Sequence, residues 1–452
     1  MLHETQNKEL RSDMDYQFGG LYPGLIAEVL SFYGPAKQIL AVMGTLCQRF
    51  RSATFQMTEL ELQHRHEETS DSAIQYIIRN RGLRRLKLVS SAVTGKQIIE
   101  MIRSTSLVSL VVQFQSELQR TVDFGFLLPS EEPLQLTALK LHDVAANGTS
   151  LLLSKCPFLT SLEVLHCSDF ADADVEGVVE SMLYQAPGSQ AAAGAAAAFS
   201  GGSAKQSTGT RLRRLVLSHL VGLQDTGLRA LAGALSHCKL QHLSFAGCRN
   251  ISHAGIQQAV STCSSLLSLD ISCVPLVSDA QAAEIVLSQG SLHQLALPPA
   301  AGAGTFRAMA QVAAAQTGFL ALDTLQLRQC AGLHGSGGVQ ELAGLLAVLP
   351  QLRRLEITWT PGLTDFAVGD IAKSVPALRE LVLDKCRRVS DRGATQALQL
   401  LPRLQLLSMR GSEATEATVE AAVQQGRVHA AAANEGVLAL TQAVPRTCVV
   451  RL

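Results

Sequence analysis

The sequence predicts an α/β solenoid, with a curved parallel sheet on the inside and helices on the outside. Three observations support this prediction. A Leu-x-x-Leu-x-Leu phrase recurs about every 26 residues along most of the 452-residue chain, a period typical of solenoid repeats. Aspartate and cysteine recur at fixed places after the phrase. Hydrophobic residues make up 47% of the chain, which is ample for a core that extends from repeat to repeat.

Each phrase is expected to form a short strand. Side chains alternate along a strand, so the apolar residues of the phrase point into the core and the residues between them point to the concave face. This spacing is the signature of a leucine-rich-repeat solenoid of about 13 repeats. The copies are Met57/Leu60/Leu62, Leu83/Leu86/Leu88, Leu107/Leu110/Val112, Leu136/Leu139/Leu141, Leu159/Leu162/Val164, Leu212/Leu215/Leu217, Leu240/Leu243/Phe245, Leu266/Leu269/Ile271, Leu292/Leu295/Leu297, Leu322/Leu325/Leu327, Leu352/Leu355/Ile357, Leu378/Leu381/Leu383 and Leu404/Leu407/Met409.

A loop and a helix are expected to follow each strand. In the more regular repeats an aspartate stands eight residues after the last apolar strand position, often preceded by Ser or Thr. Oxygen-bearing side chains at this place are typical helix N-caps, because they accept backbone N–H groups that the helix leaves unpaired. A row of metal-binding carboxylates is the alternative, and capping is favoured because each aspartate begins its own helix. These residues are Asp172, Asp225, Asp279, Asp365 and Asp391.

Seven of the ten cysteines stand at fixed places in the repeat. One set lies three residues after the last apolar strand position, and a second set lies just before the next repeat. Positions fixed in this way predict small buried side chains at turns. Zinc is disfavoured because the chain has no C-x-x-C pair. The first set is Cys167, Cys248, Cys330 and Cys386; the second is Cys156, Cys238 and Cys263.

Five regions can be delimited along the chain. Residues 1–20 are expected to be a disordered tail, and residues 21–54 a helical region. The solenoid is expected over residues 55–425, with a low-complexity Ala/Gly/Ser insertion at 185–210 that cannot bury enough surface to fold alone. Residues 426–452 are expected to cap the solenoid, with a closing strand at Cys448–Leu452, since the last repeat would otherwise expose its core.

Composition disfavours several classes of function. Lys+Arg and Asp+Glu are equal, at 38 each, which argues against a nucleic-acid partner that needs a basic footprint. A signal peptide and a membrane span are not expected, so a cytoplasmic protein is predicted, with the cilium or the nucleus as alternatives. Neither a cofactor nor catalysis is expected: the glycine clusters at Gly302/Gly304 and Gly335/Gly337/Gly338 suit turns, and His64–Glu68 suits a solvated loop.

Function is therefore expected to lie on the surface. The concave positions of the C-terminal repeats form a strip of mixed charge that suits a protein partner. Trp359, the only tryptophan, stands at its rim, and tryptophan and arginine are common interface anchors. A tryptophan that only covers the strand end is the alternative. The predicted partner-binding residues are Arg328, Arg354, Glu356, Trp359, Asp384 and Arg410.

The repeat signature resembles the cysteine-containing leucine-rich repeats of F-box/LRR proteins. The phrase runs Leu-x-x-Leu-x-Leu-x-x-Cys-x-x-Ile-Ser-Asp, with a glycine two residues later, and its closest copies are Leu378–Gly393 and Leu240–Gly255. The resemblance covers roughly residues 55–425. It is specific for the fold and much less so for function.

The segment from Leu21 to Arg51 resembles an F-box. A proline near its start, an apolar helix that ends in Ser31–Phe32, a turn at Pro35 and a closing Leu46-Cys-Gln-Arg-Phe-Arg51 follow that motif in order. Tyr22, Gly24 and Leu25 depart from it, and two plain helices that cap the solenoid would give a similar pattern. The residues that the resemblance assigns to adaptor binding are Pro23, Leu30, Ile39, Leu40, Leu46 and Phe50.

The resemblance implies a non-catalytic substrate-recognition subunit of a cullin-RING ubiquitin ligase. The N-terminal helices would dock to a Skp-type adaptor and so to the cullin, and the solenoid would hold the substrate. The alternative is a structural leucine-rich-repeat scaffold in a large assembly such as a ciliary axoneme complex. The departures from the F-box pattern favour that alternative.

Overall fold

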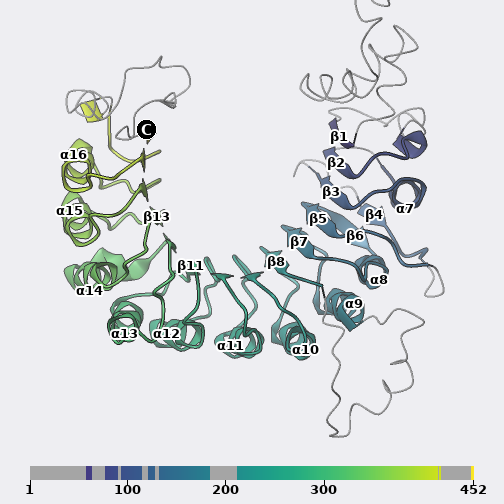
Figure 1. Ribbon diagram of the computed structural model, residues 1–452, viewed down its shortest axis with the longest axis horizontal. Coiled ribbons are helices and arrows are strands. Elements are labelled where there is room, and N and C mark those ends of the chain that lie inside the picture. The colour runs from purple at the N-terminus through teal and green to yellow at the C-terminus, as the bar shows by residue number, and fades with distance from the viewer. Residues whose placement is uncertain are drawn as a thin grey trace, which may run out of the picture. The chain divides into compact units, whose positions relative to one another are not determined.

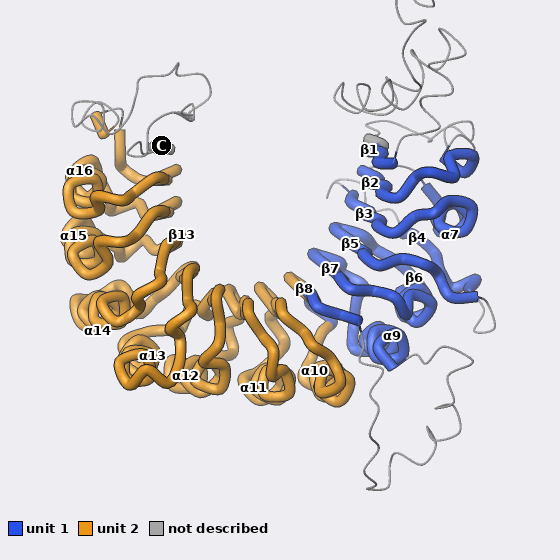
Figure 2. The backbone as a smooth tube through the Cα atoms, in the orientation of Figure 1, with its two compact units in different colours: residues 1–216, 220–222 blue, residues 217–219, 223–452 orange. Residues whose placement is uncertain are grey.

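The computed structural model describes residues 58–63, 77–89, 93–114, 121–127, 132–183, 211–415, 417–418 and 449–451. The chain divides into two compact units (Figure 2). Unit 1 is Met1–Val216 with Leu220–Gly222, and unit 2 is Leu217–His219 with Leu223–Leu452. In each unit the strands of a main parallel sheet have helices along one of their faces (Figure 1).

In unit 1 the main sheet has the order β1-β2-β3-β5-β7-β8, and its neighbouring strands from β1 to β7 are parallel. Its strands are β1 (Glu59–Gln63), β2 (Arg85–Val89), β3 (Ser109–Gln113), β5 (Ala138–His142), β7 (Ser161–Leu165) and β8 (Arg214–Ser218). Its helices are α7 (Gly95–Ser104), α8 (Thr149–Ser154) and α9 (Asp172–Leu183).

In unit 2 the strands follow one another in sequence order from β9 to β16, all parallel. They are β9 (His242–Ser244), β10 (Ser268–Asp270), β11 (Gln294–Leu297), β12 (Thr324–Arg328), β13 (Arg354–Thr358), β14 (Glu380–Val382), β15 (Leu406–Ser408) and β16 (Val449–Arg451). The helices are α10 (Asp225–Leu235), α11 (His253–Ser261), α12 (Asp279–Leu287), α13 (Ala303–Ala314), η2 (Ala331–His334), α14 (Ser336–Ala347), α15 (Asp365–Ser374) and α16 (Asp391–Leu400). The closing strand expected at the C-terminal end is present as β16, which pairs with β15.

The predicted parallel sheet with helices is confirmed, because each leucine phrase contains a strand and equivalent leucines of adjacent repeats pair. Leu325 is in register with Leu355, and Leu381 with Leu407. All four side chains are at most 1% exposed. Truncating one leucine in such a column to alanine costs about 2–5 kcal/mol, because its neighbours close the cavity only in part.

The residues between the leucines point away from the helices, to a face that we call the open face. The burial pattern of β12 alternates along its five residues: Leu325 and Leu327 are buried, whereas Thr324, Gln326 and Arg328 are half-buried. Period-two alternation is what a strand with one buried face requires. In β12 the positions expected to face outward therefore do so, whereas the predicted outward positions Thr358, Val382 and Ser408 at the ends of β13, β14 and β15 are buried.

One expectation for unit 1 was incomplete. No leucine phrase predicts a strand between Gln113 and Pro133, but Thr121–Asp123 forms the short strand β4. It pairs in parallel with β6 (Ala145–Asn147) in a separate sheet. Three residues with only Val122 buried carry too weak a pattern to be predicted as a strand.

The loop cysteines are buried, as predicted, and they also make a specific contact. The thiols of Cys248 and Cys386 donate weak hydrogen bonds to backbone carbonyls in the strand of the preceding repeat, and that of Cys330 donates to a carbonyl in the loop after β11. The Sγ atom of Cys330 lies 2.9 Å from the oxygen of Ala301, that of Cys248 3.2 Å from Leu217, and that of Cys386 3.3 Å from Ile357. The cysteine column therefore ties each loop to the preceding repeat.

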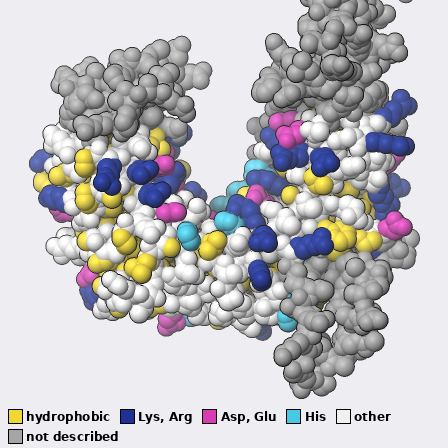
Figure 3. Space-filling model, in the orientation of Figure 1, with side chains coloured by type: hydrophobic (Ala, Val, Ile, Leu, Met, Phe, Trp, Pro, Cys, Tyr) yellow, Lys and Arg dark blue, Asp and Glu magenta, His cyan; other side chains and the backbone are white. Residues whose placement is uncertain are grey.

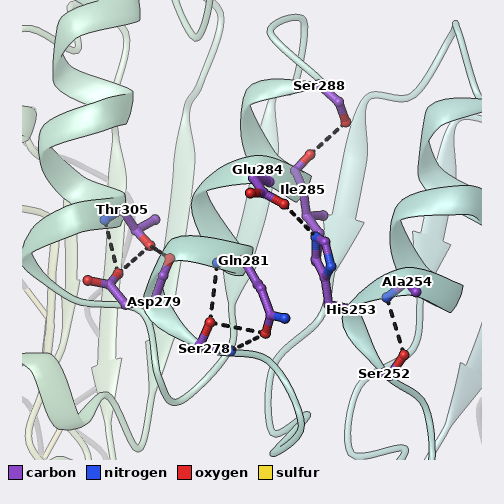
Figure 4. Close-up of polar contacts among 10 residues, drawn as sticks. All are labelled: Ser252, His253, Ala254, Ser278, Asp279, Gln281, Glu284, Ile285, Ser288 and Thr305. Atoms are coloured by element: carbon purple, nitrogen blue, oxygen red, sulfur yellow. Dashed lines mark hydrogen bonds and ion pairs between the residues drawn. The ribbon is translucent and has the colours of Figure 1, made fainter.

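Ser278, Thr364 and Ser390 cap their helices, as predicted. The aspartates do not, which corrects the expectation for Asp225, Asp279, Asp365 and Asp391; Asp172 is likewise the first residue of its helix and not the residue before it. In α12, α15 and α16 the N-cap is the preceding Ser278, Thr364 or Ser390, and in α10 it is Gln224. The aspartate is the first helical residue in each of these helices. Ser278 forms a capping box with Gln281, which leaves the carboxylate of Asp279 available for another partner (Figure 4).

That partner is the next repeat. Asp279 accepts hydrogen bonds from the backbone N–H groups of Gly302 (2.8 Å), Gly304 (2.9 Å) and Thr305 (3.0 Å), and from the Thr305 hydroxyl (2.6 Å; Figure 4). Asp365 likewise accepts from the N–H and hydroxyl groups of Ser390, at 2.8 and 2.7 Å. We call each such contact an aspartate brace. It satisfies N–H groups at the start of the next helix, which that helix cannot pair internally.

The brace explains the glycine of the repeat signature. A Cβ atom at Gly255 would lie 2.4 Å from Oδ1 of Asp225, and one at Gly393 would lie 2.4 Å from Oδ1 of Asp365. Real Cβ atoms do not approach an oxygen so closely, so the carboxylate needs glycine there. Helix α11 has His253 at the aspartate position, and its Nε2 instead lies 3.0 Å from Oε2 of Glu284 on α12 (Figure 4).

Several sequence predictions lie outside the described residues. They are the tail at 1–20, the helical region at 21–54, the loop at His64–Glu68, the insertion at 185–210 and the cap at 426–452 apart from β16. They stay predictions.

Replacing Asp279 with asparagine should destabilise the protein by about 1–3 kcal/mol, because the amide would turn an NH₂ group toward N–H donors. Partial burial raises the pKa of Asp279, but the bonds from Thr305, Gly302 and Gly304 outweigh it, so the net pKa is lowered. The brace is thus fully present above the unfolded pKa of about 4 and is lost as the pH falls through the folded value. In urea denaturation the free energy of unfolding of Asp279→Asn should be clearly lower than that of the unaltered protein at pH 7. This difference should shrink below about pH 4. Asp370→Asn, which loses only an exposed pair with Lys373, is the control; equal losses would contradict the brace.

The buried thiols should resist alkylation. Burial raises the pKa of Cys330 to about 12 and that of Cys386 to about 11, so hardly any thiolate exists at pH 8. Iodoacetamide labelling followed by peptide mass spectrometry should modify the half-buried Cys273 first and leave Cys330 and Cys386 protected until urea is added. Labelling of Cys330 as fast as Cys273 in the native protein would contradict this assignment.

Candidate partner-binding surface

The predicted partner-binding residues all lie on or beside the open face of β12 to β15. Arg328 ends β12, Arg354 and Glu356 lie on β13, and Asp384 and Arg410 follow β14 and β15. Parallel register places these strands side by side, in the order of the repeats. The structure therefore brings the six residues to one region of unit 2.

Most charges of this strip are paired with each other. Nη1 of Arg354 lies 2.6 Å from Oε2 of Glu380, and its Nη2 lies 3.2 Å from Oε2 of Glu356. Burial lowers the pKa of Arg354, but the two carboxylates outweigh it and raise that pKa. A cation shared by two carboxylates leaves little free charge for a partner, so this cluster chiefly holds neighbouring strands in register.

Asp384 is held in the same way by the following repeat. It accepts a hydrogen bond from the Ser408 hydroxyl at 2.7 Å and one from the backbone N–H of Arg410 at 2.9 Å. The Arg410 side chain adds an ion pair at 3.7 Å. Arg328, in contrast, has no acidic partner among the described residues. Of the predicted strip, Arg328 and Trp359 are the members whose polar or aromatic groups remain most available.

Trp359 belongs to a column of residues that follow the strands directly and have a left-handed backbone. Its φ is 55° and its side chain is 53% exposed. The backbone N–H group of Trp359 bonds the carbonyl of Asp384 at 3.0 Å, which extends the hydrogen bonding between β13 and β14 beyond the strands. The Nζ atom of Lys385 lies 5.6 Å from the centre of the Trp359 ring. The column in the described residues is Asp143, His166, His219, Gly247, Cys273, Gln329, Trp359, Lys385 and Gly411.

The loops beside Trp359 carry basic residues that were not predicted as part of the site. Arg387, Arg388 and Arg392 are exposed, and the guanidinium of Arg392 lies 4.8 Å from the ring centre of Phe366. Residues 351–415 hold ten basic and seven acidic residues in a chain of zero net charge. Figure 3 shows Lys and Arg side chains gathered over the part of unit 2 that carries α15 and α16. The adjacent arginines in Lys385-Cys-Arg-Arg were the sequence signal for this charge.

The open face of unit 1 is also internally paired. Arg85 bonds Glu59 at 2.6 Å, and Lys87 bonds Glu61 at 2.9 Å across β1 and β2. Glu163 lies between Lys140 (3.0 Å) and Arg214 (2.7 Å). Opposite charges on neighbouring strands stabilise the pairing of those strands. This pattern is structural and does not by itself mark a binding site.

The described residues carry neither a metal-binding cluster nor a helix that could span a membrane. Within them, no group of three or more His, Cys, Asp or Glu side chains is placed to hold a metal ion. Across the same ranges, no helix is both long and apolar enough to cross a bilayer.

Comparison with known proteins supports the fold. No protein-family model and no curated protein sequence matches the chain. Among solved structures, it is similar to the crystal structure of a Rad7 and Elc1 complex from yeast, with a TM-score of 0.54 and 14% identity over 92% of this chain and 91% of that one. A TLR13–ssRNA13 complex gives a TM-score of only 0.45 and 14% identity, over 79% of this chain and 50% of that one, too weak for any argument. The chain has the α/β leucine-rich-repeat solenoid fold.

The left-handed column gives a stability prediction. Gln329 has a φ of 54°, a region that costs a non-glycine residue about 1–2 kcal/mol, so Gln329→Gly should raise the free energy of unfolding by up to about 1 kcal/mol after the entropy cost of glycine. Gln326→Gly, within β12 where the backbone is extended, should lower the free energy of unfolding. Thermal denaturation of both variants is the measurement, and a lower melting temperature for Gln329→Gly would contradict the prediction.

Proposed function

We propose that this protein is a non-catalytic protein-binding module that serves as the substrate-recognition subunit of a cullin-RING ubiquitin ligase. The observation that carries the binding role is the region around Trp359. An exposed tryptophan with strained backbone stands beside basic side chains without acidic partners, at the rim of a sheet on which most other charges are paired internally. Folding does not need such a side chain, since glycine occupies equivalent positions at Gly247 and Gly411.

The ligase role rests on two weaker supports. The first is the resemblance of Leu21–Arg51 to an F-box, which would use Pro23, Leu30, Ile39, Leu40, Leu46 and Phe50 to bind a Skp-type adaptor. The second is the similarity in fold to a protein solved in complex with another protein, Rad7 with Elc1. At 14% identity this similarity supports a protein-binding role and identifies no partner.

Co-purification tests the ligase role. The full chain and a Leu30→Asp/Leu40→Asp variant would be mixed with a tagged Skp-type adaptor. The full chain should retain the adaptor, and the variant should retain at least about tenfold less, because carboxylates replace apolar side chains assigned to the contact. The matched control is Leu276→Asp/Leu287→Asp, which places the same change at exposed leucines of the solenoid and should leave capture unchanged.

Failure of the unaltered chain to retain the adaptor would overturn the ligase role. The scaffold alternative, a solenoid that holds its place in a large assembly, would then be favoured. Equal capture by the Leu30/Leu40 variant would reject the assignment of the adaptor-binding residues.

A further inference from the structure

We propose that the two adjacent loops between β13 and α15 and between β14 and α16 form a docking surface for an acidic peptide segment with an apolar side chain. We call this surface the basic rim; it comprises Trp359, Phe366, Lys385, Arg387, Arg388 and Arg392. The inference rests on the protein-binding role proposed above and specifies the chemistry of the partner. It does not involve the N-terminal helices.

The two loops are fixed against each other at both ends. The N–H group of Trp359 bonds the carbonyl of Asp384 at the strand side. At the helix side, Asp365 accepts two hydrogen bonds from Ser390. Between these points the thiol of Cys386 bonds the carbonyl of Ile357. A surface made by two braced loops is preorganised, so little conformational entropy would be lost when a partner binds.

Exposed aromatic rings are concentrated on this surface. Trp359 is 53% exposed and Phe366 66% exposed, and no other aromatic ring is among the exposed large hydrophobic side chains of the described residues. They stand at the two ends of one loop. The equivalent of Phe366 is Thr226 in α10, Ala254 in α11 and Ala280 in α12, so the repeat does not require an aromatic residue there.

The rim's cations have no acidic partner among the described residues. Lys385 and Arg392 lie over the rings of Trp359 and Phe366, at 5.6 and 4.8 Å. Arg387 and Arg388 are exposed between them. The equivalent positions hold Ser168/Asp169, Arg249/Asn250, Pro275/Leu276, Ala331/Gly332 and Pro361/Gly362 in other repeats. Adjacent like charges on one loop repel each other, so this pattern is unfavourable for folding alone.

The nearby carboxylates are already engaged. Asp365 is bonded to Ser390, and Asp384 to Ser408 and Arg410. Asp391 accepts hydrogen bonds from the N–H and hydroxyl groups of Thr415, both at 2.7 Å. Only the exposed Glu413 has no such engagement. These hydrogen bonds come mainly from neutral groups and leave the carboxylates charged, but none of these carboxylates forms an ion pair with a cation of the rim. The rim's cations can therefore bind an external anion.

The geometry favours an acidic peptide over a nucleic acid. Guanidinium groups bind carboxylates through paired, charge-assisted hydrogen bonds, and an exposed tryptophan accepts an apolar side chain. Three cations on the β14–α16 loop and a fourth at the start of α16 match a short peptide with a few Asp or Glu residues. A nucleic-acid site needs a longer basic track along the phosphates, whereas the strip beside the rim consists of alternating paired charges.

The single tryptophan provides a direct test on the unaltered full-length chain. A tryptophan-free peptide of glutamates with a central leucine would be titrated while the fluorescence of Trp359 is recorded. Binding at the rim should shift the emission to shorter wavelength and reduce quenching by acrylamide, because the ring leaves water. It should also weaken as salt is added, since exposed charges are screened over about 8–10 Å. A peptide in which lysine replaces glutamate should produce no change.

Variants with matched charge locate the site. Arg387→Glu/Arg388→Glu should weaken binding of the fluorescein-labelled acidic peptide by about tenfold or more, as expected for interface arginines. Arg353→Glu/Arg379→Glu makes the same change at exposed residues that immediately precede β13 and β14. The five residues of β13 separate Arg353 from the rim by about 16 Å, which exceeds the distance over which salt screens exposed charges. This control should therefore change the affinity for the peptide by less than about twofold.

Three outcomes would overturn the proposal. The first is an unchanged Trp359 emission spectrum at saturating peptide. The second is an equal loss of peptide affinity in the two double variants. The third is tighter binding of labelled single-stranded oligouridylate than of the acidic peptide. Each is separable from a failure of the ligase role. Adaptor capture tests residues 21–54, and the Arg387/Arg388 variant should retain the adaptor normally.

Discussion

The structure depends on hydrogen bonds that pass from one repeat to the next. A repeat of this size cannot bury its apolar face alone, so adjacent repeats must stack in one register. The aspartate brace fixes the helix side of that register, the cysteine thiol fixes the loop, and the left-handed residue extends the strand ladder. In the repeat of β13 these contacts are made by Asp365, Cys386 and Trp359. Each satisfies a polar group that stacking would otherwise leave buried and unpaired.

These contacts also determine which residues are free to bind. The carboxylates of the loops are engaged by the next repeat, and those on the open face of β13 and β14 are engaged by arginines. The basic side chains of the β14–α16 loop have no such role. A chain of zero net charge can therefore present basic side chains without ion-pair partners, because its acidic residues are held by contacts between repeats while some of its basic residues are not.

The sequence was sufficient for the elements but not for their contacts. The leucine phrase located the strands because its period matches a buried column, and the predicted outward positions follow from alternation. The aspartates were assigned to their own helices because capping is a local rule, whereas the brace joins residues 23–27 positions apart, such as Asp279 with Thr305 and Asp391 with Thr415. The strand β4 was missed because three residues carry too little periodicity.

By itself, then, the sequence determined the repeat, the buried cysteine and leucine columns, and the location of a mixed-charge strip near Trp359. Only the tertiary structure decided that Arg354, Glu356, Asp384 and Arg410 are mostly paired with one another or with Glu380 and Ser408. It likewise placed Phe366 and Arg392 in contact beside Trp359 and Lys385. The physical reason is that composition along the chain gives the number of charges, but pairing depends on register between strands about 26 residues apart.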